Sequence, residues 1–461
     1  MNGFFYLPVM DNFISINPYN GQVVHTFKAI SEKELEEKLN LSQTVFQSWK
    51  ATSLADRTDL LKRVGSLLRD NTLEYAKMIT LEMGKPIQES IGEINKCALV
   101  CDYYADNAKA FLADEVIPTE AKLSFVKQDP IGTIFAVMPW NFPFWQVFRF
   151  LAPTLTAGNN AVLKHASNVF GCAALIESIF LKAGYPIGVF QNLIVHHNQT
   201  EKIIAHKTIK AVSLTGSEAA GSAVAAIAGK HIKKSLLELG GSNAFIVWED
   251  ADIDQIIQTA VNARMLNNGQ SCIAAKRFIL LEGIYDEFVD KFKAAVSTLK
   301  SGDTMDKNTA IGPLARIDLA NQLQEQVQTS INAGAVLILG GQQKDCFHEP
   351  TILGNVKPGM PAFDEETFGP LAAMIKAKDI EHAFALSEMS TFGLGITVCT
   401  QDIEKALSYA GRVSDGAYFI NELVKSDPRL PFGGTKKSGY GRELAKDGIL
   451  EFVNRKTVYV K

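Results

Sequence analysis

The sequence lacks the features that mark membrane, secreted or nucleic-acid-binding proteins. No apolar run reaches the ~18 residues that a membrane-spanning helix needs. The first residues, MNGFFYLPVMDNF, have no basic segment followed by an apolar core, so we expect no signal peptide. The 46 basic residues do not outnumber the 50 acidic ones, and the net charge of −4 argues against nucleic acid or an anionic membrane as a partner. These absences favour small-molecule chemistry.

Cysteine is scarce and scattered. None of the six cysteines forms a CxxC pair or stands at metal-ligand spacing from a histidine, so the sequence predicts no disulfide framework and no metal site. Cys97 and Cys101 lie one turn apart on a predicted helix over Gln88–Leu112. Such a pair can bind a metal or form a redox couple, but two cysteines on one helical face more often belong to the core. Reduced thiols predict a cytoplasmic protein. The six are Cys97, Cys101, Cys172, Cys272, Cys346 and Cys399.

The composition is that of a soluble globular protein with two or more domains and a sizeable core, since 47% of the 461 residues are hydrophobic and 21% are charged. Short apolar stretches alternate with helical patterns from residue 131 onward, which predicts βαβ units and a parallel sheet. A second α/β region follows, from Ala244 to about Asn421. The predicted strands of the first region are Thr133–Met138, Ala161–Lys164, Leu193–Val195 and Ala211–Leu214, and the helices before it are Ser31–Lys50, Leu54–Met83 and Gln88–Leu112.

Three polar motifs follow strands of the first region directly: Pro139–Asn141, Lys164–Ser167 and Gly216–Ser217. Ligands bind beyond the carboxyl ends of strands in such sheets, so the three motifs should line one edge and form a dinucleotide site. Gly216 and Ser217 would turn the chain into a helix whose free N–H groups face a pyrophosphate. No G-x-G-x-x-G is present, and a glycine-rich strand–helix turn alone is common in α/β proteins that bind no ligand.

The candidate nucleophile is Cys272. It ends a polar, flexible run, NNGQS, and such a setting is more typical of a reactive thiol than of a structural one. Glu238 ends an apolar run and is followed, after Leu239, by two glycines. It can act as a base, and a buried structural carboxylate is the alternative for this residue.

Five motifs occur together in a fixed order: PWNFP (139–143), LTGS (214–217), LELGG (237–241), GQSC (269–272) and EETFGP (365–370). With them the chain resembles the NAD(P)-dependent aldehyde dehydrogenases over essentially its whole length. The resemblance implies an α/β fold with a variant Rossmann cofactor domain (residues 1–112 and 130–238), an α/β catalytic domain (239–421) and a small oligomerisation element (113–129 and 422–461). It also implies a homodimer or homotetramer, because the stretches Ser124–Lys127 and Thr457–Lys461 resemble strands that pair across subunits.

The resemblance assigns roles to individual residues. Cys272 attacks the aldehyde, Asn141 and the backbone N–H of Cys272 stabilise the oxyanion, and Glu238 activates the hydrolytic water. Lys164, counted among the catalytic set, contacts the adenosine ribose, and Glu366 contacts the nicotinamide ribose. The implied cofactor contacts are Trp140, Asn141, Lys164, His165, Ala166, Ser167, Gly216, Ser217, Leu239, Glu366 and Phe368.

Position 167 bears on cofactor choice. Many members of the family read Lys-Pro-Ser-Glu where this chain reads Lys164-His165-Ala166-Ser167. The missing glutamate would hydrogen-bond a ribose 2′-hydroxyl and repel a 2′-phosphate, so the sequence predicts NADP or NAD, with NADP slightly favoured.

The stretch Ser426–Leu444 looks like that of the succinate-semialdehyde dehydrogenases, whose substrate carries a carboxylate. Arginine binds carboxylates through its planar fork, and Arg149, eight residues after Asn141, is the first candidate. Arg264 and Arg429 are further candidates, whereas Leu266 occupies a position where relatives often carry another arginine. A surface salt bridge is the alternative for any one of them.

Other functions stay open on the sequence alone. A general aliphatic aldehyde dehydrogenase would share the same motifs. A cysteine hydrolase would need a base such as His231 near Cys272, and a noncatalytic binding protein would be expected to have lost Cys272 or Glu238, which are both present.

Overall fold

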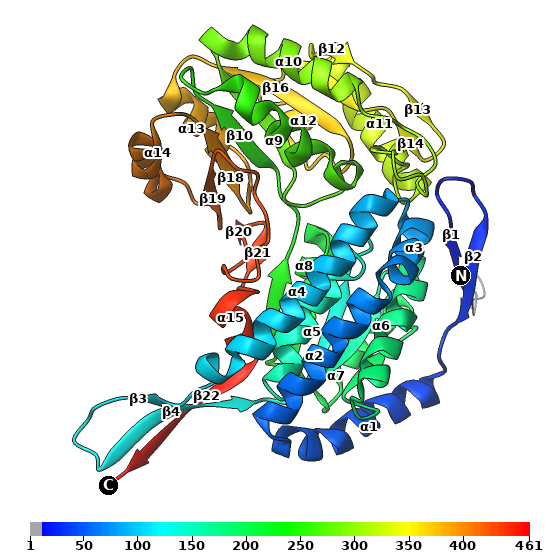
Figure 1. The fold of residues 1–461 in the computed structure, drawn as a ribbon, viewed down its shortest axis with the longest axis vertical. Helices are drawn as coiled ribbons and strands as arrows, with labels where there is room; N and C mark the ends of the chain where they lie inside the picture. The colour runs from blue at the N-terminus through cyan, green and yellow to red at the C-terminus, as the bar shows by residue number, and fades with distance from the viewer. Residues whose placement is uncertain (1–11) are drawn as a thin grey trace, which may run out of the picture.

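The computed structural model describes residues 12–461. Residues 1–11, which hold most of the stretch in which we looked for a signal peptide, lie outside the described part. Two α/β units stand one above the other, and a narrow β arm projects from the lower one (Figure 1). Within residues 12–461, no helix combines the length and apolarity needed to span a membrane.

Four helices precede the first unit. The capping box of α1 is formed as its sequence predicts, because Ser31 and Glu34 exchange hydrogen bonds at its start. The single predicted helix over Leu54–Met83 is wrong: it breaks at Asn71, whose φ of −121° and ψ of 24° leave the helical region. The four are α1 (Glu32–Ala51), α2 (Leu54–Asp70), α3 (Thr72–Met83) and α4 (Ile87–Phe111).

The lower unit contains a six-stranded sheet of order β21-β9-β8-β5-β6-β7. All neighbours are parallel except the short edge strand β21. The predicted strand at Leu193–Val195 is wrong, since β7 forms three residues earlier. The elements are β5 (Thr133–Met138), α5 (Trp145–Thr156), β6 (Asn160–His165), α6 (Phe170–Ala183), β7 (Phe190–Asn192), α7 (Thr200–Ala205), β8 (Ile209–Thr215), α8 (Glu218–Lys230), β9 (Lys234–Glu238) and β21 (Gly439–Tyr440).

The upper unit contains a seven-stranded sheet of order β12-β15-β16-β11-β10-β18-β19, with separate apolar clusters packed against it. Only β12 runs antiparallel to its neighbour. The elements are β10 (Asn243–Val247), α9 (Ile253–Met265), β11 (Ala275–Leu281), α10 (Tyr285–Ser297), α11 (Ile317–Asn332), β12 (Val336–Leu339), β15 (Thr351–Gly354), β16 (Leu371–Ala377), α13 (Ile380–Glu388), β18 (Ile396–Cys399), α14 (Ile403–Tyr409) and β19 (Tyr418–Ile420).

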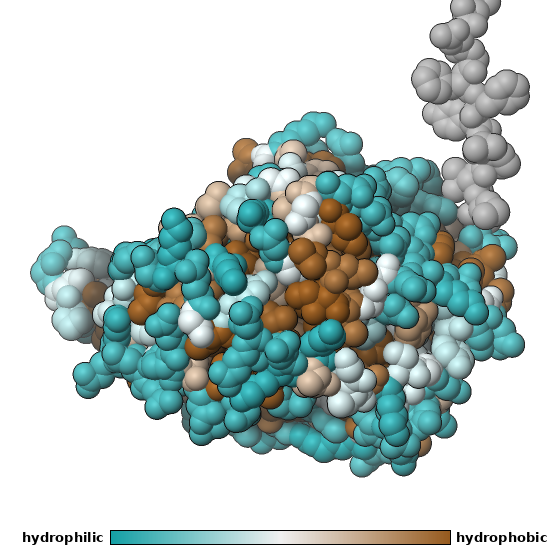
Figure 2. Space-filling view, turned by 90° about the horizontal axis from the view of Figure 1, so that it is seen from above, coloured by the Kyte–Doolittle hydropathy of each residue, from teal (hydrophilic) through white to brown (hydrophobic). Residues whose placement is uncertain are grey.

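The arm is a three-stranded antiparallel sheet of β3 (Glu115–Val116), β4 (Leu123–Pro130) and β22 (Val453–Val460). The two stretches singled out in the sequence pair here with each other in one chain, Val126 opposite Thr457. The arm exposes apolar side chains, among them Val116 and Tyr459. The end of the molecule that is uppermost in Figure 1 is mainly hydrophilic with apolar patches between (Figure 2).

Candidate active site

Cys272 lies on a loop between α9 and β11 whose backbone is strained. Asn267 and Asn268 both adopt left-handed conformations, with φ of 56° and 54°. Such residues persist only where their surroundings hold them. Here the Asn267 N–H donates to Glu89 Oε2 at 2.7 Å, and Asn268 Oδ1 accepts from the Gly312 N–H at 2.7 Å. Contacts from two separate parts of the chain therefore fix the loop that presents the thiol.

The predicted oxyanion donor lies beside this loop. Asn141 is buried after β5, and its Nδ2 donates to the carbonyl of Gln270 at 3.1 Å. Asn267 Nδ2 donates in turn to the Asn141 carbonyl at 2.7 Å. A side-chain amide has two N–H groups, so the bond to Gln270 orients Asn141 and leaves one donor for a ligand.

The two glycines after Glu238 allow close approach of the catalytic loop and of Glu366. A Cβ on Gly240 would stand 2.4 Å from Glu366 Oε2, and one on Gly241 would stand 2.6 Å from the carbonyl oxygen of Cys272. The Gly241 N–H also donates to Glu366 Oε1 at 3.0 Å. The LELGG motif thus brings three parts of the site together because no side chain separates them.

A cavity of about 360 Å³ opens at Cys272. Trp140 and Phe368 meet across it with ring centroids 5.7 Å apart and nearly perpendicular planes. Cys272 is half-buried, whereas Cys97, Cys101, Cys172 and Cys399 are fully buried. The lining residues are Pro139, Trp140, Asn141, Gln146, Thr215, Gly216, Ser217, Leu239, Gly240, Cys272, Arg316, Leu319, Gln322, Glu366 and Phe368.

A buried charged group adjoins the thiol. Arg149 Nε lies 2.5 Å from Glu443 Oε2, and Arg149 Nη2 lies 3.4 Å from Thr215 Oγ1. Burial raises the pKa of Glu238 well above its usual range, and the charge of Glu443 adds to this, whereas Arg149 opposes it. A carboxyl with a raised pKa is better matched to taking a proton near neutral pH than an ordinary glutamate.

Opposing effects act on the pKa of the Cys272 thiol. Burial raises the pKa of Cys272 to about 11, while the cations Lys276 and Arg149 act to lower it. The carboxylates of Glu366 and Glu238 add to the increase. Lys276 is fully buried and donates to the carbonyls of Ser271 and Cys272, both at 2.6 Å.

Seven of the eleven residues predicted to bind a dinucleotide line the cavity, and residues 164–167 do not; the seven are Trp140, Asn141, Gly216, Ser217, Leu239, Glu366 and Phe368. Ser217 caps α8, with its hydroxyl accepting from the Ala220 N–H at 3.3 Å, and the α8 N-terminus faces the cavity. Gly221 gives room to Leu239, since a Cβ there would stand 2.5 Å from Leu239 Cδ2. A helix N-terminus beside the cavity suits a diphosphate, so these residues fit a dinucleotide.

The residues of the Lys164–Ser167 motif differ in exposure and in their contacts. Lys164 is half-buried at the end of β6 and burial lowers its pKa, while Ser167 is exposed. The assignment of His165 to the cofactor is not supported by its position. Its ring is buried, its Nε2 lies 2.9 Å from the Pro143 carbonyl, and its Nδ1 accepts from the Ala166 N–H. His165 therefore supports the PWNFP loop.

Two of the three substrate arginines are placed elsewhere. Arg264 is fully buried and donates to the carbonyls of Thr367 and Gly369, so it holds the loop that carries Glu366 and Phe368. Arg429 is exposed and forms two hydrogen bonds with Asp427, at 2.9 and 2.7 Å. None of the three, Arg149 included, is among the residues that line the cavity at Cys272, and Arg149 is distinguished instead by its charge, which acts on both Cys272 and Glu238. Sequence position alone could not separate them from Arg149.

His231, the base that a cysteine hydrolase would use, lies at the far end of α8. This helix has 13 residues and Ser217 at its other end lines the cavity, so about 20 Å separate the histidine from the site. The structure gives His231 no access to Cys272.

Several residues at or near the site were not predicted. Arg316 lines the cavity, lies over Trp140 at 5.8 Å, and is held by Asp318. Lys96 donates to Ser426 Oγ at 2.9 Å and lies over the Trp145 ring at 4.2 Å. Arg316 directly precedes α11 and Lys96 lies on α4, so both are distant in sequence from the motifs. Of these residues and their partners, only Ser426, in the SDPR stretch, had a sequence signal.

Comparisons with known proteins agree with this geometry. The aldehyde dehydrogenase family model matches residues 9–458. A protein named probable succinate-semialdehyde dehydrogenase, NADP(+), from Synechocystis is 49% identical over 449 residues, which are 97% of this chain and 99% of the relative. A succinate semialdehyde dehydrogenase, NAD(P)+, of Escherichia coli K12 is 45% identical, with 97% of both chains covered.

Solved structures extend the likeness to the fold. The crystal structure of succinic semialdehyde dehydrogenase from Streptococcus pyogenes with NADP+ superposes with a TM-score of 0.95 at 37% identity, and it covers 97% of this chain and 99% of that one. The two α/β units are thus the variant Rossmann and catalytic units of this fold. On its motifs, its site and these matches, the chain belongs to the aldehyde dehydrogenase family.

Proposed function

We propose that the protein oxidises succinate semialdehyde, or a similar short aldehyde with a distal carboxylate, to the acid with reduction of NADP or NAD. The observation that carries the proposal is a half-exposed Cys272 and an amide donor on Asn141 at one cavity, with a buried charged group of Glu238, Arg149 and Glu443 nearby. The charges of Glu238 and Arg149 in this group act on the thiol. The relatives named for this activity span almost all of the chain.

The chain's own groups divide the chemistry into two parts. Cys272 Sγ bonds to the aldehyde carbon, and the oxygen that gains negative charge accepts from the free N–H of Asn141 Nδ2 and from the Cys272 N–H. A bound nicotinamide supplies the hydride acceptor. Glu238 then takes a proton from water, the water oxygen bonds to the acyl carbon, and the C–S bond breaks to release the acid and the thiol.

For the cofactor, we propose that Trp140, Gly216, Ser217, Leu239, Glu366 and Phe368 hold the nicotinamide and diphosphate part, while Lys164, Ala166 and Ser167 adjoin the adenosine ribose. NADP is slightly favoured because exposed Ser167 brings no negative charge. Ser167→Glu should shift the ratio of kcat/KM toward NAD, since a carboxylate there repels only the 2′-phosphate. An unchanged ratio would place Ser167 away from the ribose.

For the substrate, we propose Arg149 as the carboxylate anchor. It is the one predicted arginine whose charge acts on both Cys272 and Glu238, and this supports the proposal. Burial lowers the pKa of Lys96, and repulsion by the nearby Arg149 cation adds to this decrease. Two neighbouring cations make a favourable surrounding for an anion.

The test is the ratio of kcat/KM for succinate semialdehyde to that for butanal. Arg149→Ala should lower this ratio roughly 30- to 5000-fold, the effect of about 2–5 kcal/mol for a charged pair broken on one side. Arg149→Lys should recover part of it, because it keeps the charge and loses the fork. Butanal turnover reports whether the variant is folded.

Arg316→Ala is the comparison variant, since Arg316, unlike Arg149, lines the cavity itself. If the ratio falls for Arg316→Ala and not for Arg149→Ala, Arg316 is the anchor. An unchanged ratio in both variants would mean that the chain is a general aliphatic aldehyde dehydrogenase.

We further propose that residues 1–112 and 130–238 form the cofactor domain, 239–421 the catalytic domain, and 113–129 with 422–461 the oligomerisation element of a cytoplasmic homodimer or homotetramer. The support is the separation of the six-, seven- and three-stranded sheets and the exposed apolar side chains of the arm. Deleting residues 117–122 at the arm's turn leaves the core untouched, and sedimentation should then show a smaller assembly.

A further inference from the structure

Lys276 is a fully buried lysine to which neither the motifs nor the proposed mechanism assigns a role. Its side chain leaves β11, the strand that follows the Cys272 loop, and turns back under that loop. Its ammonium donates to the carbonyls of Ser271 and Cys272 at 2.6 Å each, and it lies 3.6 Å from Glu366 Oε1. A buried lysine is costly unless its charge is used or balanced.

The positive charge of Lys276 is only partly compensated by a nearby carboxylate. Glu366 is the only carboxylate within 4.0 Å of its ammonium among residues 12–461, and that carboxylate also accepts from the Gly241 N–H and lines the cavity. Arg264 faces Lys276 from α9 as a second cation. The positive charge of Lys276 therefore remains available to a second anion, and the Cys272 thiol, whose charge acts on Lys276, can become one.

We infer that Lys276 is the positioning residue of the nucleophile: its ammonium holds the Cys272 loop through two carbonyls and stabilises the Cys272 thiolate by its charge. The inference rests on the proposed role of Cys272. The other groups that face the thiol are Arg149 from α5, Glu238 from β9 and Glu366 from the 365–370 loop.

This role has a pH signature. Burial lowers the pKa of Lys276 to about 8, with Arg264 contributing and Glu366 opposing. Lys276 therefore carries its charge below about pH 8 and loses it above. Since the charge favours the thiolate, its benefit is present below that pH and disappears as the pH rises through it.

The test measures the rate at which iodoacetamide alkylates Cys272 in the cofactor-free enzyme between pH 6 and 10, with the labelled peptide quantified by mass spectrometry. In Lys276→Gln, whose amide keeps N–H donors for the carbonyls, labelling should be about tenfold slower than in wild type below pH 8, the effect of about one pKa unit. Above pH 9 the two rates should converge. A loosened loop would instead change the rate by the same factor at every pH.

Glu366→Gln provides the second variant. Because Glu366 raises the pKa of Lys276, its removal should move the pH at which labelling changes slope below 8. Labelling of Cys97 and Cys101, which are fully buried, controls for general unfolding. A Lys276→Gln rate equal to wild type below pH 8, or a slope change unmoved in Glu366→Gln, overturns the inference. Since labelling needs neither aldehyde nor cofactor, this result is independent of whether the proposed substrate is correct.

Discussion

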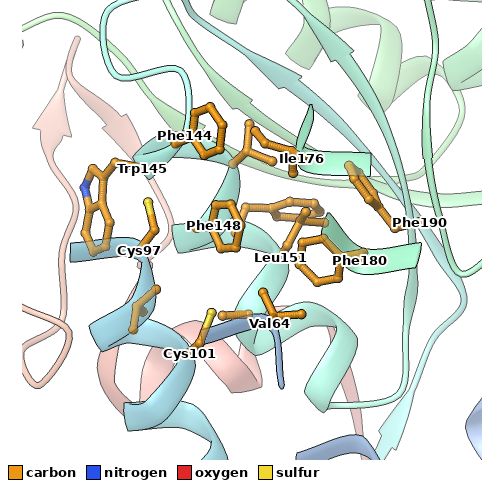
Figure 3. Close-up of a cluster of buried hydrophobic side chains, with 14 of the residues drawn as sticks. Val64, Cys97, Cys101, Phe144, Trp145, Phe148, Leu151, Ile176, Phe180 and Phe190 are labelled. Atoms are coloured by element: carbon orange, nitrogen blue, oxygen red, sulfur yellow. The ribbon is translucent and has the colours of Figure 1, made fainter. Parts of the chain in front are cut away.

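Two regions of the molecule carry cysteines in contrasting settings: the helix α4, with Cys97 and Cys101, and the loop that ends at Cys272. The α4 pair lies fully buried among apolar side chains, including Trp145 and Phe148 (Figure 3). Burial raises the pKa of both thiols well above the usual range. Burial also raises the pKa of Cys272, to about 11. Nearby cations oppose the increase in both regions, but Cys272 also lines a cavity, whereas the α4 pair is fully buried. The comparison indicates that access from a cavity, more than the presence of neighbouring cations, separates a reactive thiol from a structural one.

The α4 region still contributes to the site. Glu89, in the first turn of α4, accepts from the Asn267 N–H, and Glu93 accepts from the N–H groups of Phe144 and Trp145 at the start of α5. The same helix thus supplies core packing on one stretch and support for the catalytic loop on another.

The largest expected effect separates the two thiol settings directly. Cys272→Ala should lower turnover by about 10⁴-fold or more, because the covalent route is lost, while NADP binding measured by fluorescence survives. Cys97→Ala is the matched control and should keep wild-type turnover, with some loss of thermal stability from a small cavity. Substantial turnover in Cys272→Ala would remove the covalent mechanism.

Glu238→Gln tests whether the base beside Cys272 acts only after acylation. Steady turnover should fall by about 10²–10⁴-fold, the usual contribution of general-base catalysis. A rapid burst of reduced cofactor should remain, because Cys272 and Asn141 are unchanged. Stopped-flow absorbance at the wavelength of the reduced nicotinamide measures both. Turnover near wild type would mean that another group activates the water.

The pH dependence of kcat/KM tests the charge balance at Cys272. The pKa of Cys272 is about 11 and that of Glu238 is also raised, and both must lose a proton to act. Activity should therefore rise with pH across neutrality, by up to about tenfold per unit where thiolate formation limits the rate. If kcat/KM reached its plateau below pH 7, Lys276 and Arg149 would lower the pKa of Cys272 to well under 11.

The smallest expected effect concerns Glu89, the link between the two regions. Burial raises its pKa from 4.5 to about 7, so its contribution is most favourable to folding below pH 4.5 and declines as pH rises toward 7. Glu89→Gln removes the charge and keeps an oxygen for the Asn267 N–H. Its free energy of unfolding in urea should exceed that of wild type by about 1 kcal/mol at pH 8, with little difference at pH 5. A loss at pH 8 would mean that the charge itself holds the loop.

Much of the fold followed from local patterns. The capping box at Ser31, the strand Thr133–Met138 and the helix N-terminus at Ser217 were all predictable, because caps and buried parallel strands have short-range signals. The break at Asn71 and the position of β7 were missed, since tertiary packing decides between near-equal local alternatives.

The site shows the same division. By its motifs alone the sequence determined the family, the candidate nucleophile at Cys272 and the candidate base at Glu238, because these residues sit in compact local signatures. Only the tertiary structure decided which arginine stands beside them, that His165 supports a loop, and that Lys276 lies beneath the thiol. Charges act through space, so their effect on a pKa depends on contacts between residues far apart in the chain, which no local pattern records.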